Sequence, residues 1–352
     1  MNPAEAVLPV TIRDDADPAL VAAYVRAHPQ GTPFHLPTWI GAIETATGHR
    51  ATMLAAERGG AIVGVLPLTA VKSRIFGKAL VSSGFAVGGG VLADDEAAQA
   101  ALVDTAWARA RSGRYPSLEL RGGPMPGGDG WIHKLDSYAG FVRPIETDDD
   151  AQLKAIPRKQ RAEVRKALDA GMTVTIGRGD ADRKAHYAVY AESVRNLGTP
   201  VFPKALFAAV LDAFGEDADI LTVRHEGQPV ASVLSLYHNG TVMPYWGGGT
   251  FGARALRANE LMYFSLMRHA RERGGTAFDF GRSKPGTGAF AYKKNWGFEP
   301  EPLGYAIRTA DGEAPREVNP LNPKYQAKIK AWQKLPLWLA NRLGPPIARG
   351  LG

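Results

Sequence analysis

The stretch FDFGRSKPGTGAFAYKKNWGF, from Phe278 to Phe298, joins a short apolar strand to a loop rich in glycine and cations. Phenylalanines flank Asp279, and alternate residues of a strand point to opposite faces, so we expect the carboxylate to face away from both rings. Gly281 ends the strand. We expect residues 296–298 to form a second, aromatic strand. Open α/β sheets bind ligands beyond the carboxyl ends of their strands, so the segment predicts a functional loop.

The loop carries a dense set of cations that suits an anionic ligand. A solvated basic surface is the ordinary alternative for such residues. The loop's length and glycine content serve no evident packing purpose, and this favours binding. The two phenylalanines beside Asp279 are expected in the core. The cations are Arg282, Lys284, Lys293 and Lys294.

Two tracts of the chain are predicted to have the same order of elements: strand, hairpin, strand, glycine-rich loop, helix, strand. The first tract covers residues 53–120 and the second covers residues 221–280. A duplicated β-β-β-α-β module is the most economical explanation, and it predicts an α/β (α+β) sheet in each half. A chain of 352 residues also suits two domains. The expected divisions are a first domain at 1–147, a linker helix at 148–170, a second domain at 171–310 and a basic, aromatic tail at 311–352.

Composition narrows the class of protein further. With 45% hydrophobic and 22% charged residues, the chain is globular. It has no cysteine, which excludes disulfides, thiolate metal sites and a cysteine nucleophile. No histidine, aspartate and glutamate spacing suggests a metal site, and no Ser-His-Asp arrangement is recognisable. A net charge of +7 favours an anionic partner, although such an excess also serves solubility alone.

The N-terminal residues lack a basic stretch followed by an apolar one, and no apolar run approaches the ~20 residues of a spanning helix. We therefore expect a cytoplasmic protein. The segment 324–349 mixes two tryptophans with several lysines and arginines. Such a segment is suited to peripheral contact with an anionic membrane. Docking on the protein's own body is the alternative, because prolines interrupt any long helix there.

The pattern FDFGRS…G…F…KK.WG resembles the C-terminal signature of the Fem-like branch of the GNAT acyltransferase superfamily. The similarity is strongest to the FemAB proteins associated with exosortase (XrtA) and PEP-CTERM exopolysaccharide systems. It extends over nearly the whole chain. The further matching segments are PRKQRAEVRK at 157–166, RNLGTPVF at 195–202, RANEL at 257–261, NPLNPKY at 319–325 and NRLGP at 341–345.

The resemblance implies two tandem GNAT-like domains, each a mixed twisted sheet flanked by helices. It implies transfer of an acyl or aminoacyl group to an amine, with acyl-CoA or aminoacyl-tRNA as co-substrate and no tightly bound cofactor. The acceptor would be an amine-bearing precursor of cell-envelope, peptidoglycan or exopolysaccharide metabolism, and DNA is not an expected partner. The family's pyrophosphate loop is not clearly present at residues 247–254, and this departure keeps aminoacyl-tRNA open as the donor. A degenerate, non-catalytic pair of domains that binds a polysaccharide precursor or an assembly partner is the alternative.

Direct attack of an amine on an activated carbonyl needs orientation, a proton acceptor and oxyanion stabilisation. Asp279 and Tyr245 are the candidate proton acceptors or orienting groups, and Lys293 is the candidate for oxyanion or phosphate stabilisation. A structural hydrogen bond that caps the loop is an equal alternative for Asp279. Helix termination is the alternative for Arg195 and Thr199, and strand packing for Trp246. The candidate substrate- or donor-binding residues are Arg282, Ser283, Lys284, Lys294, Tyr292, Trp246, Arg195, Thr199, Asn259, Arg161 and Arg165.

Overall fold

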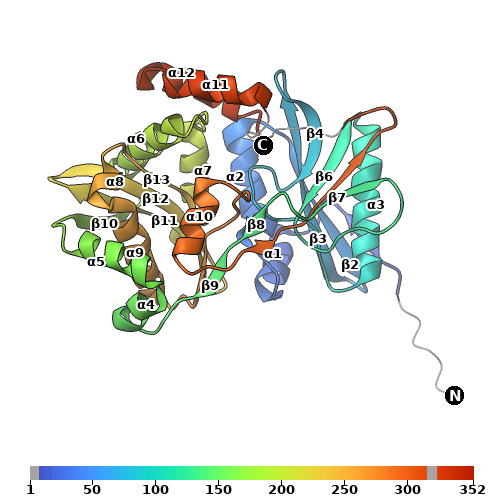
Figure 1. Cartoon of the computed structure of the whole chain (residues 1–352). Coiled ribbons are helices and arrows are strands. Elements are labelled where there is room, and N and C mark those ends of the chain that lie inside the picture. The colour runs from blue at the N-terminus through green and yellow to red at the C-terminus, as the bar shows by residue number, and fades with distance from the viewer. Residues whose placement is uncertain (1–7, 315–322) are drawn as a thin grey trace. The chain divides into compact units, whose positions relative to one another are not determined.

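The computed structural model describes residues 8–314 and 323–352, with the side chains of 323–325 excepted. The chain divides into two compact units, each with its own sheet (Figure 1). Within the described residues, the first unit comprises 8–135, 304–314 and 352, and the second comprises 136–303 and 323–351.

The first unit contains a sheet in the order β1-β2-β3-β4-β6-β16-β7, with β5 paired to β3. Its hairpin β2–β3 closes at Gly59 and Gly60, whose φ angles of 59° and 83° suit a tight turn that glycine adopts without strain. The elements are β1 (Thr11–Arg13), α1 (Pro18–Ala27), a 3₁₀ turn (Pro33–His35), α2 (Pro37–Thr47), β2 (Ala51–Arg58), β3 (Ala61–Ser73), β4 (Gly77–Ser82), β5 (Leu92–Ala93), α3 (Glu96–Ser112), β6 (Ser117–Arg121), β7 (Trp131–Lys134) and β16 (Tyr305–Thr309).

The second unit contains a sheet in the order β10-β11-β12-β13-β14-β9 and a small ladder of β15 with β8. Its hairpin β12–β13 closes at Asn239-Gly240, both residues with positive φ, which is the strongest short hairpin signal. The elements are β8 (Ala139–Gly140), β9 (Val142–Pro144), α4 (Asp149–Ala155), α5 (Arg158–Leu168), β10 (Thr173–Gly177), α6 (Asp180–Asn196), α7 (Lys204–Phe214), a 3₁₀ turn (Gly215–Asp217), β11 (Ala218–His225), β12 (Gln228–His238), β13 (Thr241–Gly249), α8 (Ala253–Leu256), α9 (Ala258–Glu272), β14 (Ala277–Asp279), α10 (Gly288–Asn295), β15 (Glu301–Pro302), α11 (Pro323–Gln333) and α12 (Leu337–Ala348).

The two sheets repeat one module. In the first unit β2, β3, β4, α3 and β6 occur in this order, with the short β5 before α3, and β4 pairs with β6 in parallel. In the second unit β11, β12, β13, α9 and β14 follow in the same order, and β13 pairs with β14 in parallel. This confirms the predicted duplication and the α/β class. The repeat also extends upstream, because a strand and two helices precede each module.

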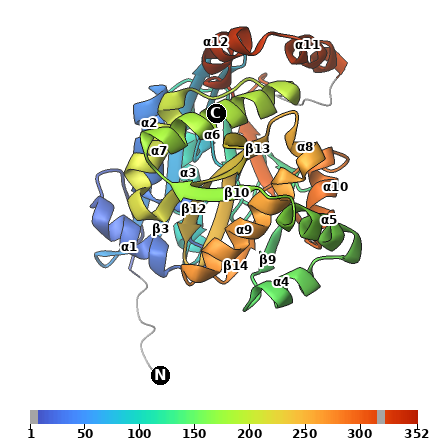
Figure 2. The same ribbon diagram turned by 90° about the vertical axis from the view of Figure 1, so that its left-hand side faces the viewer.

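Helices α6 and α9 cover opposite faces of the second sheet (Figure 2). His186 of α6 bonds to Ser232 of β12, which marks the face toward α6. The neighbouring Val233 points the other way and joins the core cluster that contains Phe264 of α9. The alternation of side chains along β12 therefore separates a polar contact from an apolar core.

Two strands lie outside the ranges expected from the sequence. Residues 142–144, expected in the first domain, form β9 of the second sheet, where Arg143 pairs with Phe278. Residues 305–309, expected in the second domain, form β16 of the first sheet, where Ala306 pairs with Leu120. Each half of the sequence thus supplies a strand to the sheet of the other half: β9 is an edge strand, whereas β16 lies between β6 and β7. Such long-range pairing leaves no local signal.

The expected linker helix at 148–170 is two helices, α4 and α5, and it belongs to the second unit. The break falls at Ile156, which is extended (φ −76°, ψ 134°) because proline disfavours a helical conformation in the residue before it. Val164 and Ala167 are fully buried in the core of the second unit. The segment is therefore part of that core rather than a linker.

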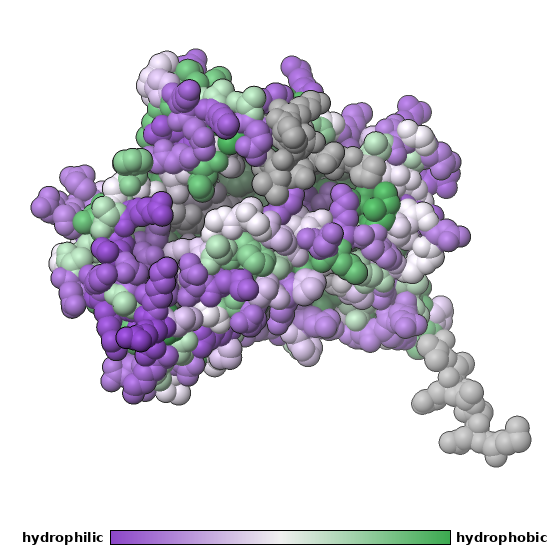
Figure 3. Space-filling view, in the orientation of Figure 1, coloured by the Kyte–Doolittle hydropathy of each residue, from purple (hydrophilic) through white to green (hydrophobic). Residues whose placement is uncertain are grey.

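Helices α11 and α12 pack on α6 and on the segment that follows it. Arg195 donates to the Gln333 carbonyl (3.2 Å), and Gly344 lies so close to Val201 that a Cβ would come within 2.9 Å of its backbone nitrogen. Figure 3 shows hydrophobic and hydrophilic residues side by side on these helices. Within the described residues no helix is both long and apolar enough to span a membrane. Most of the matching tail segment at 319–325 lies outside the described residues.

We predict that Gly248→Ala destabilises the second unit by about 1–3 kcal/mol. A Cβ there would lie 2.2 Å from the Ser193 hydroxyl oxygen and 2.6 Å from the Ser193 Cβ, and because rotating the hydroxyl does not relieve the second clash, α6 must move away from β13. Gly252→Ala is the matched control, because nothing lies within 4 Å of its Cβ position. Urea unfolding followed by circular dichroism measures the difference. Equal stability of the two variants would show that this close approach does not constrain the fold.

Candidate active site

The parallel pairing of β13 with β14 is very short. Thr241 pairs with Ala277 and Val242 with Phe278, and the parallel register ends there. Beyond these pairs β13 continues to Gly249 with β12 as its partner. We call the region between residues 243–249 and residues 279–284 the strand divergence. Tyr263 of α9 lies there, with its hydroxyl 3.6 Å from the position of a Cβ at Gly247.

The corresponding place in the first unit is filled by backbone. Parallel pairing of β4 with β6 is equally short, and it joins Leu80 to Leu118 and Val81 to Glu119. After it, however, a Cβ on Gly90 would lie 1.9 Å from the Gly122 carbonyl oxygen. Glycine is required because the two chain segments are in contact. Of the two repeats, the second therefore offers the place for a ligand.

The loop after β14 is followed by a helix. Thr287 caps α10 by accepting from the Phe290 amide (3.3 Å) and also donates to the Lys284 carbonyl (2.7 Å). Residues 296–298 follow the end of α10 and form no strand, so the expected aromatic strand is wrong. Trp296 and Phe298 remain core residues, with 0% and 2% of their surfaces exposed. Apolar composition therefore predicted their burial but not their secondary structure.

Lys293 of α10 braces the loop from inside. Its Nζ donates to the carbonyl oxygens of Gly281 (3.0 Å) and Arg282 (2.9 Å), and only 9% of its surface is exposed. An ammonium group has three hydrogens, so one remains for a further acceptor. Asp279 accepts from the Gly281 amide (2.7 Å), which is the loop-capping bond expected as its alternative role. Its second carboxylate oxygen does not take part in that bond.

Burial shifts the pKa of both groups in the direction that favours the uncharged form. It lowers the pKa of Lys293 to about 8, while the charge of Asp279 opposes the shift. Burial likewise raises the pKa of Asp279, opposed by the Gly281 amide and by the charge of Lys293. A lysine and a carboxyl group that are both shifted toward neutral pH are suited to proton transfer and charge stabilisation.

The other loop residues have different surroundings. Arg282 and Lys284 both lie over the ring of Tyr138, at 4.6 and 5.7 Å from its centroid. Ser283 is buried and forms a backbone bridge with Ala139. Lys294 is exposed. The structure thus brings Arg282 and Lys284 together at one aromatic ring and leaves Lys294 on the outer side of α10.

Three buried polar atoms beside the strand divergence lack a hydrogen-bond partner within the described residues. They are Asn259 Oδ1, the Tyr292 hydroxyl and Trp296 Nε1. The side chains of Trp296 and Glu260 nevertheless lie close enough to the Tyr292 hydroxyl to shift its pKa, so Asn259 Oδ1 is the clearest of the three. Buried polar groups are normally bonded, so unpartnered ones indicate a ligand or water. Burial, reinforced by the charge of Glu260, raises the pKa of Tyr263 to about 12 and also raises that of Tyr292. Both hydroxyls therefore stay protonated and can donate.

Sequence reasoning selected Asn259 and Tyr292 but missed Glu260, Tyr263 and Trp296. Glu260 and Tyr263 lie one and four residues after Asn259 on α9. Helical spacing from Asn259 would have found Tyr263, because residues four apart share one face. Trp296 was expected as part of an aromatic strand, and in the structure it is fully buried. Only the tertiary structure shows that its indole N–H has no partner.

Several backbone amides of the glycine-rich turn after β13 already donate hydrogen bonds within the protein. Thr250 donates to the Val230 carbonyl (2.9 Å), Phe251 to the Glu192 carboxylate (2.7 Å) and Ala253 to the Thr250 carbonyl (3.1 Å). Phosphate sites at helix starts rely on free amides and an absence of negative charge. The occupied amides and the nearby carboxylate of Glu192 thus disfavour a pyrophosphate in this turn.

Several other candidates have structural contacts. Trp246 is buried and packs edge-on against Phe207 with centroids 5.0 Å apart, which is the packing expected as its alternative role. Tyr245 lies against Trp246 at 4.8 Å. Arg195 bonds to the C-terminal helices, as described above, and the Thr199 amide bonds to the Val194 carbonyl at the end of α6. Arg161 and Arg165 lie on α5, and Arg165 is exposed.

The two repeated modules define a tandem GNAT fold. Residues 157–294 match the family model of the acetyltransferase (GNAT) domain. The solved structure of FemX is similar, with a TM-score of 0.69 and 18% identity over 90% of this chain and 99% of FemX. The C-terminal domain of a putative lysylphosphatidylglycerol synthetase from Agrobacterium fabrum is similar with a TM-score of 0.55 and 11% identity, over 83% of this chain and 92% of that domain. A tandem GNAT protein from the clavulanic acid biosynthesis pathway is similar with a TM-score of 0.52 and 16% identity, over 87% of this chain and 100% of that protein. No curated protein sequence matches.

We predict that Lys293 makes stability depend on alkaline pH. Its folded pKa of about 8 lies below the ordinary value of about 10.4, so between these values the unfolded chain binds a proton that the folded protein has released. Raising the pH through this window must therefore stabilise the fold, by at most about 3 kcal/mol. Urea unfolding at several pH values should show that the free energy of unfolding of the wild type rises relative to that of Lys293→Met as the pH increases.

The control is Lys154→Met, which removes an exposed lysine from α4 of the same unit. Its stability difference from wild type should stay constant across the window. A constant difference for Lys293→Met as well would contradict the lowered pKa.

Proposed function

We propose that this protein transfers an activated acyl or aminoacyl group to an amine at the strand divergence of the second unit. The observation that carries the proposal is the buried pair Lys293 and Asp279, which hold the loop that begins where β14 stops pairing with β13. The GNAT fold supports this chemistry. In the first unit the corresponding place is filled by backbone, and this supports one acyl-transfer site per chain.

The roles of Lys293 and Asp279 follow from the hydrogen and the oxygen that their structural bonds leave unused. The neutral amine of the acceptor attacks the donor carbonyl and forms a C–N bond, and the remaining N–H of Lys293 or the Tyr292 hydroxyl stabilises the oxyanion. The second carboxylate oxygen of Asp279 accepts the proton that the amine loses. The C–O or C–S bond of the donor then breaks, and the leaving group takes up a proton. Tyr245 is a second candidate for orienting the amine.

The donor is proposed to be anionic, with its phosphates at Arg282 and Lys284 and on the exposed Lys294. The occupied amides of the glycine-rich turn favour aminoacyl-tRNA over acyl-CoA. The likeness in fold to FemX and to a putative lysylphosphatidylglycerol synthetase agrees with an aminoacyl donor. As acceptor we propose an amine-bearing envelope precursor, in an exopolysaccharide system of the exosortase and PEP-CTERM type.

Lys293→Ala should reduce turnover by roughly 100-fold or more with aminoacyl-tRNA or acyl-CoA and an amine acceptor, and Arg282→Ala should weaken donor binding. Lys154→Ala on α4 serves as a charge-matched control and should retain full turnover. Product formation is measured by mass spectrometry. If neither loop variant changes turnover or donor binding, the loop is not the active site, and a non-catalytic binding role becomes the better explanation.

Salt dependence separates the two donors. If aminoacyl-tRNA is bound through phosphates at Arg282, Lys284 and Lys294, its affinity should fall by roughly 20- to 40-fold between 50 and 200 mM salt, because cations condensed on the RNA are released on binding. Acyl-CoA has far fewer phosphates and should depend on salt much less. Filter binding at several salt concentrations measures both. An affinity for aminoacyl-tRNA that hardly changes with salt would exclude it as the donor.

A further inference from the structure

A second candidate binding site lies in the second unit, away from the strand divergence. It is a cavity of about 720 Å³ between α6, α7 and α12, which we call the three-helix pocket. The volume lies within the range of about 300–1,000 Å³ that is typical of small-molecule sites. Because α6 covers the sheet face opposite α9, the pocket and the candidate active site lie on different faces of the sheet.

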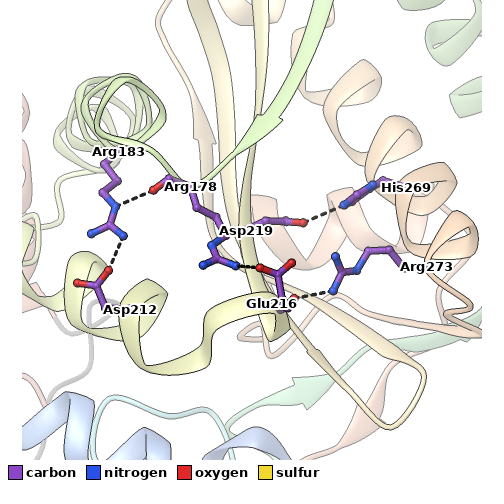
Figure 4. Close-up of polar contacts among 7 residues, drawn as sticks. All are labelled: Arg178, Arg183, Asp212, Glu216, Asp219, His269 and Arg273. Atoms are coloured by element: carbon purple, nitrogen blue, oxygen red, sulfur yellow. Dashed lines mark hydrogen bonds and ion pairs between the residues drawn. The ribbon is translucent and has the colours of Figure 1, made fainter.

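The pocket is strongly cationic. Lys184, Lys204 and Arg342 line it together with Arg183, while Asp180 is the single acidic residue of the lining. Arg183 is already engaged, since it bonds to Asp212 of α7 and to the Arg178 carbonyl (Figure 4). The other three cations come from three different helices. A converging set of this kind suits a multiply charged anion such as phosphate.

Aromatic rings stand beside the cations. Trp338 of α12 lines the pocket with 68% of its surface exposed, although tryptophan is usually well buried. Tyr187 and Phe207 form a buried part of the lining. Lys204 Nζ lies 5.0 Å from the centroid of the Tyr187 ring, which holds the ammonium in place at the pocket. The exposed indole is available to pack against a flat or apolar ligand group.

One buried polar atom in the lining lacks a partner. Asn341 Oδ1 of α12 has no hydrogen-bond partner within the described residues. An amide that is rotated by 180° would place a donor at the same position, so the group suits either kind of ligand atom. This unpartnered buried group is independent of the surface charge, and it indicates a missing ligand atom or water.

The walls of the pocket are fixed before any ligand binds. Arg183 ties α6 to α7 through Asp212, and the contact of Gly344 with Val201 seats α12. A site that is held in this way loses little conformational entropy on binding. Trp338 is not needed for this seating, because most of its surface remains in solvent.

We propose that the three-helix pocket binds a phosphate ester whose organic part is flat or apolar. Lys184, Lys204 and Arg342 hold the phosphate, Asn341 bonds to the ligand, and Trp338 packs against its organic part. The same chemistry is offered by a soluble nucleotide or by the headgroup of an anionic phospholipid. The proposal does not depend on the acyl transfer proposed for the strand divergence.

The test compares two probes on the full-length protein. UMP, which combines a phosphate with a flat ring, is titrated by calorimetry, and vesicles of phosphatidylglycerol or phosphatidylcholine are used for co-sedimentation. We expect Lys204→Gln and Arg342→Gln each to weaken binding of the effective probe by about tenfold. Trp338→Ala should weaken it by a similar factor. Lys154→Gln is the charge-matched control, and Arg282→Ala tests whether the probe binds at the candidate active site instead.

Each outcome decides the proposal. Binding of UMP that is lost in the pocket variants and kept in Arg282→Ala supports a soluble phosphate ester. Binding of phosphatidylglycerol vesicles alone, with the same dependence on variants, supports a lipid headgroup. Failure of both probes to bind overturns the proposal, and so does binding that Arg282→Ala abolishes while the pocket variants retain it. Loss of acyl transfer in any variant bears on the other site and is scored separately.

Discussion

The parallel pairing of β13 with β14 over two residues is the constraint on which the second unit depends. A full ladder would have satisfied the side of β13 that faces β14 and left no place for a ligand. Because pairing stops at Val242 and Phe278, the aromatic ring of Tyr263 and the loop after Asp279 occupy the region instead. The first unit has the same short pairing, but Gly90 and Gly122 bring its backbone segments into contact. Duplication thus produced two similar sheets, which differ in that the backbone segments after the short parallel pairing are in contact in the first.

Lys293 links the stability of this loop to its proposed chemistry. It holds two loop carbonyls from inside the protein, and the burial that this requires lowers its pKa. A surface lysine would keep its charge at much higher pH but would not brace the loop. Asp279 has the complementary position, because it caps the loop through Gly281 while burial raises its pKa. Lys293 uses two of its three hydrogens in these bonds and Asp279 uses one of its two oxygens, so one hydrogen and one oxygen remain for the proposed substrate.

The C-terminal helices contribute contacts to the second unit and form one wall of a second cavity. Gly344 allows α12 to approach Val201 closely, and this approach brings Trp338 and Arg342 to the cations of α6 and α7. The segment that was expected to lie either on a membrane or on the protein's own body is docked on α6 in the structure. Its exposed tryptophan nevertheless stands beside cations, as a site for a phosphate ester requires.

Local features of the sequence were sufficient for the repeated order of elements and for the position of the loop. Alternation around Asp279, the Asn239-Gly240 turn and the apolar stripe of α9 each act over a few residues, so each can be seen without the rest of the chain. Residues 296–298 were misassigned because β-propensity and burial cannot be separated in a short aromatic run. The exchange of β9 and β16 between the sheets, the carbonyl partners of Lys293 and the unpartnered atoms of Asn259 and Trp296 all depend on residues distant in sequence. Only the tertiary structure decides them, because no local pattern specifies which distant group will lie within bonding distance.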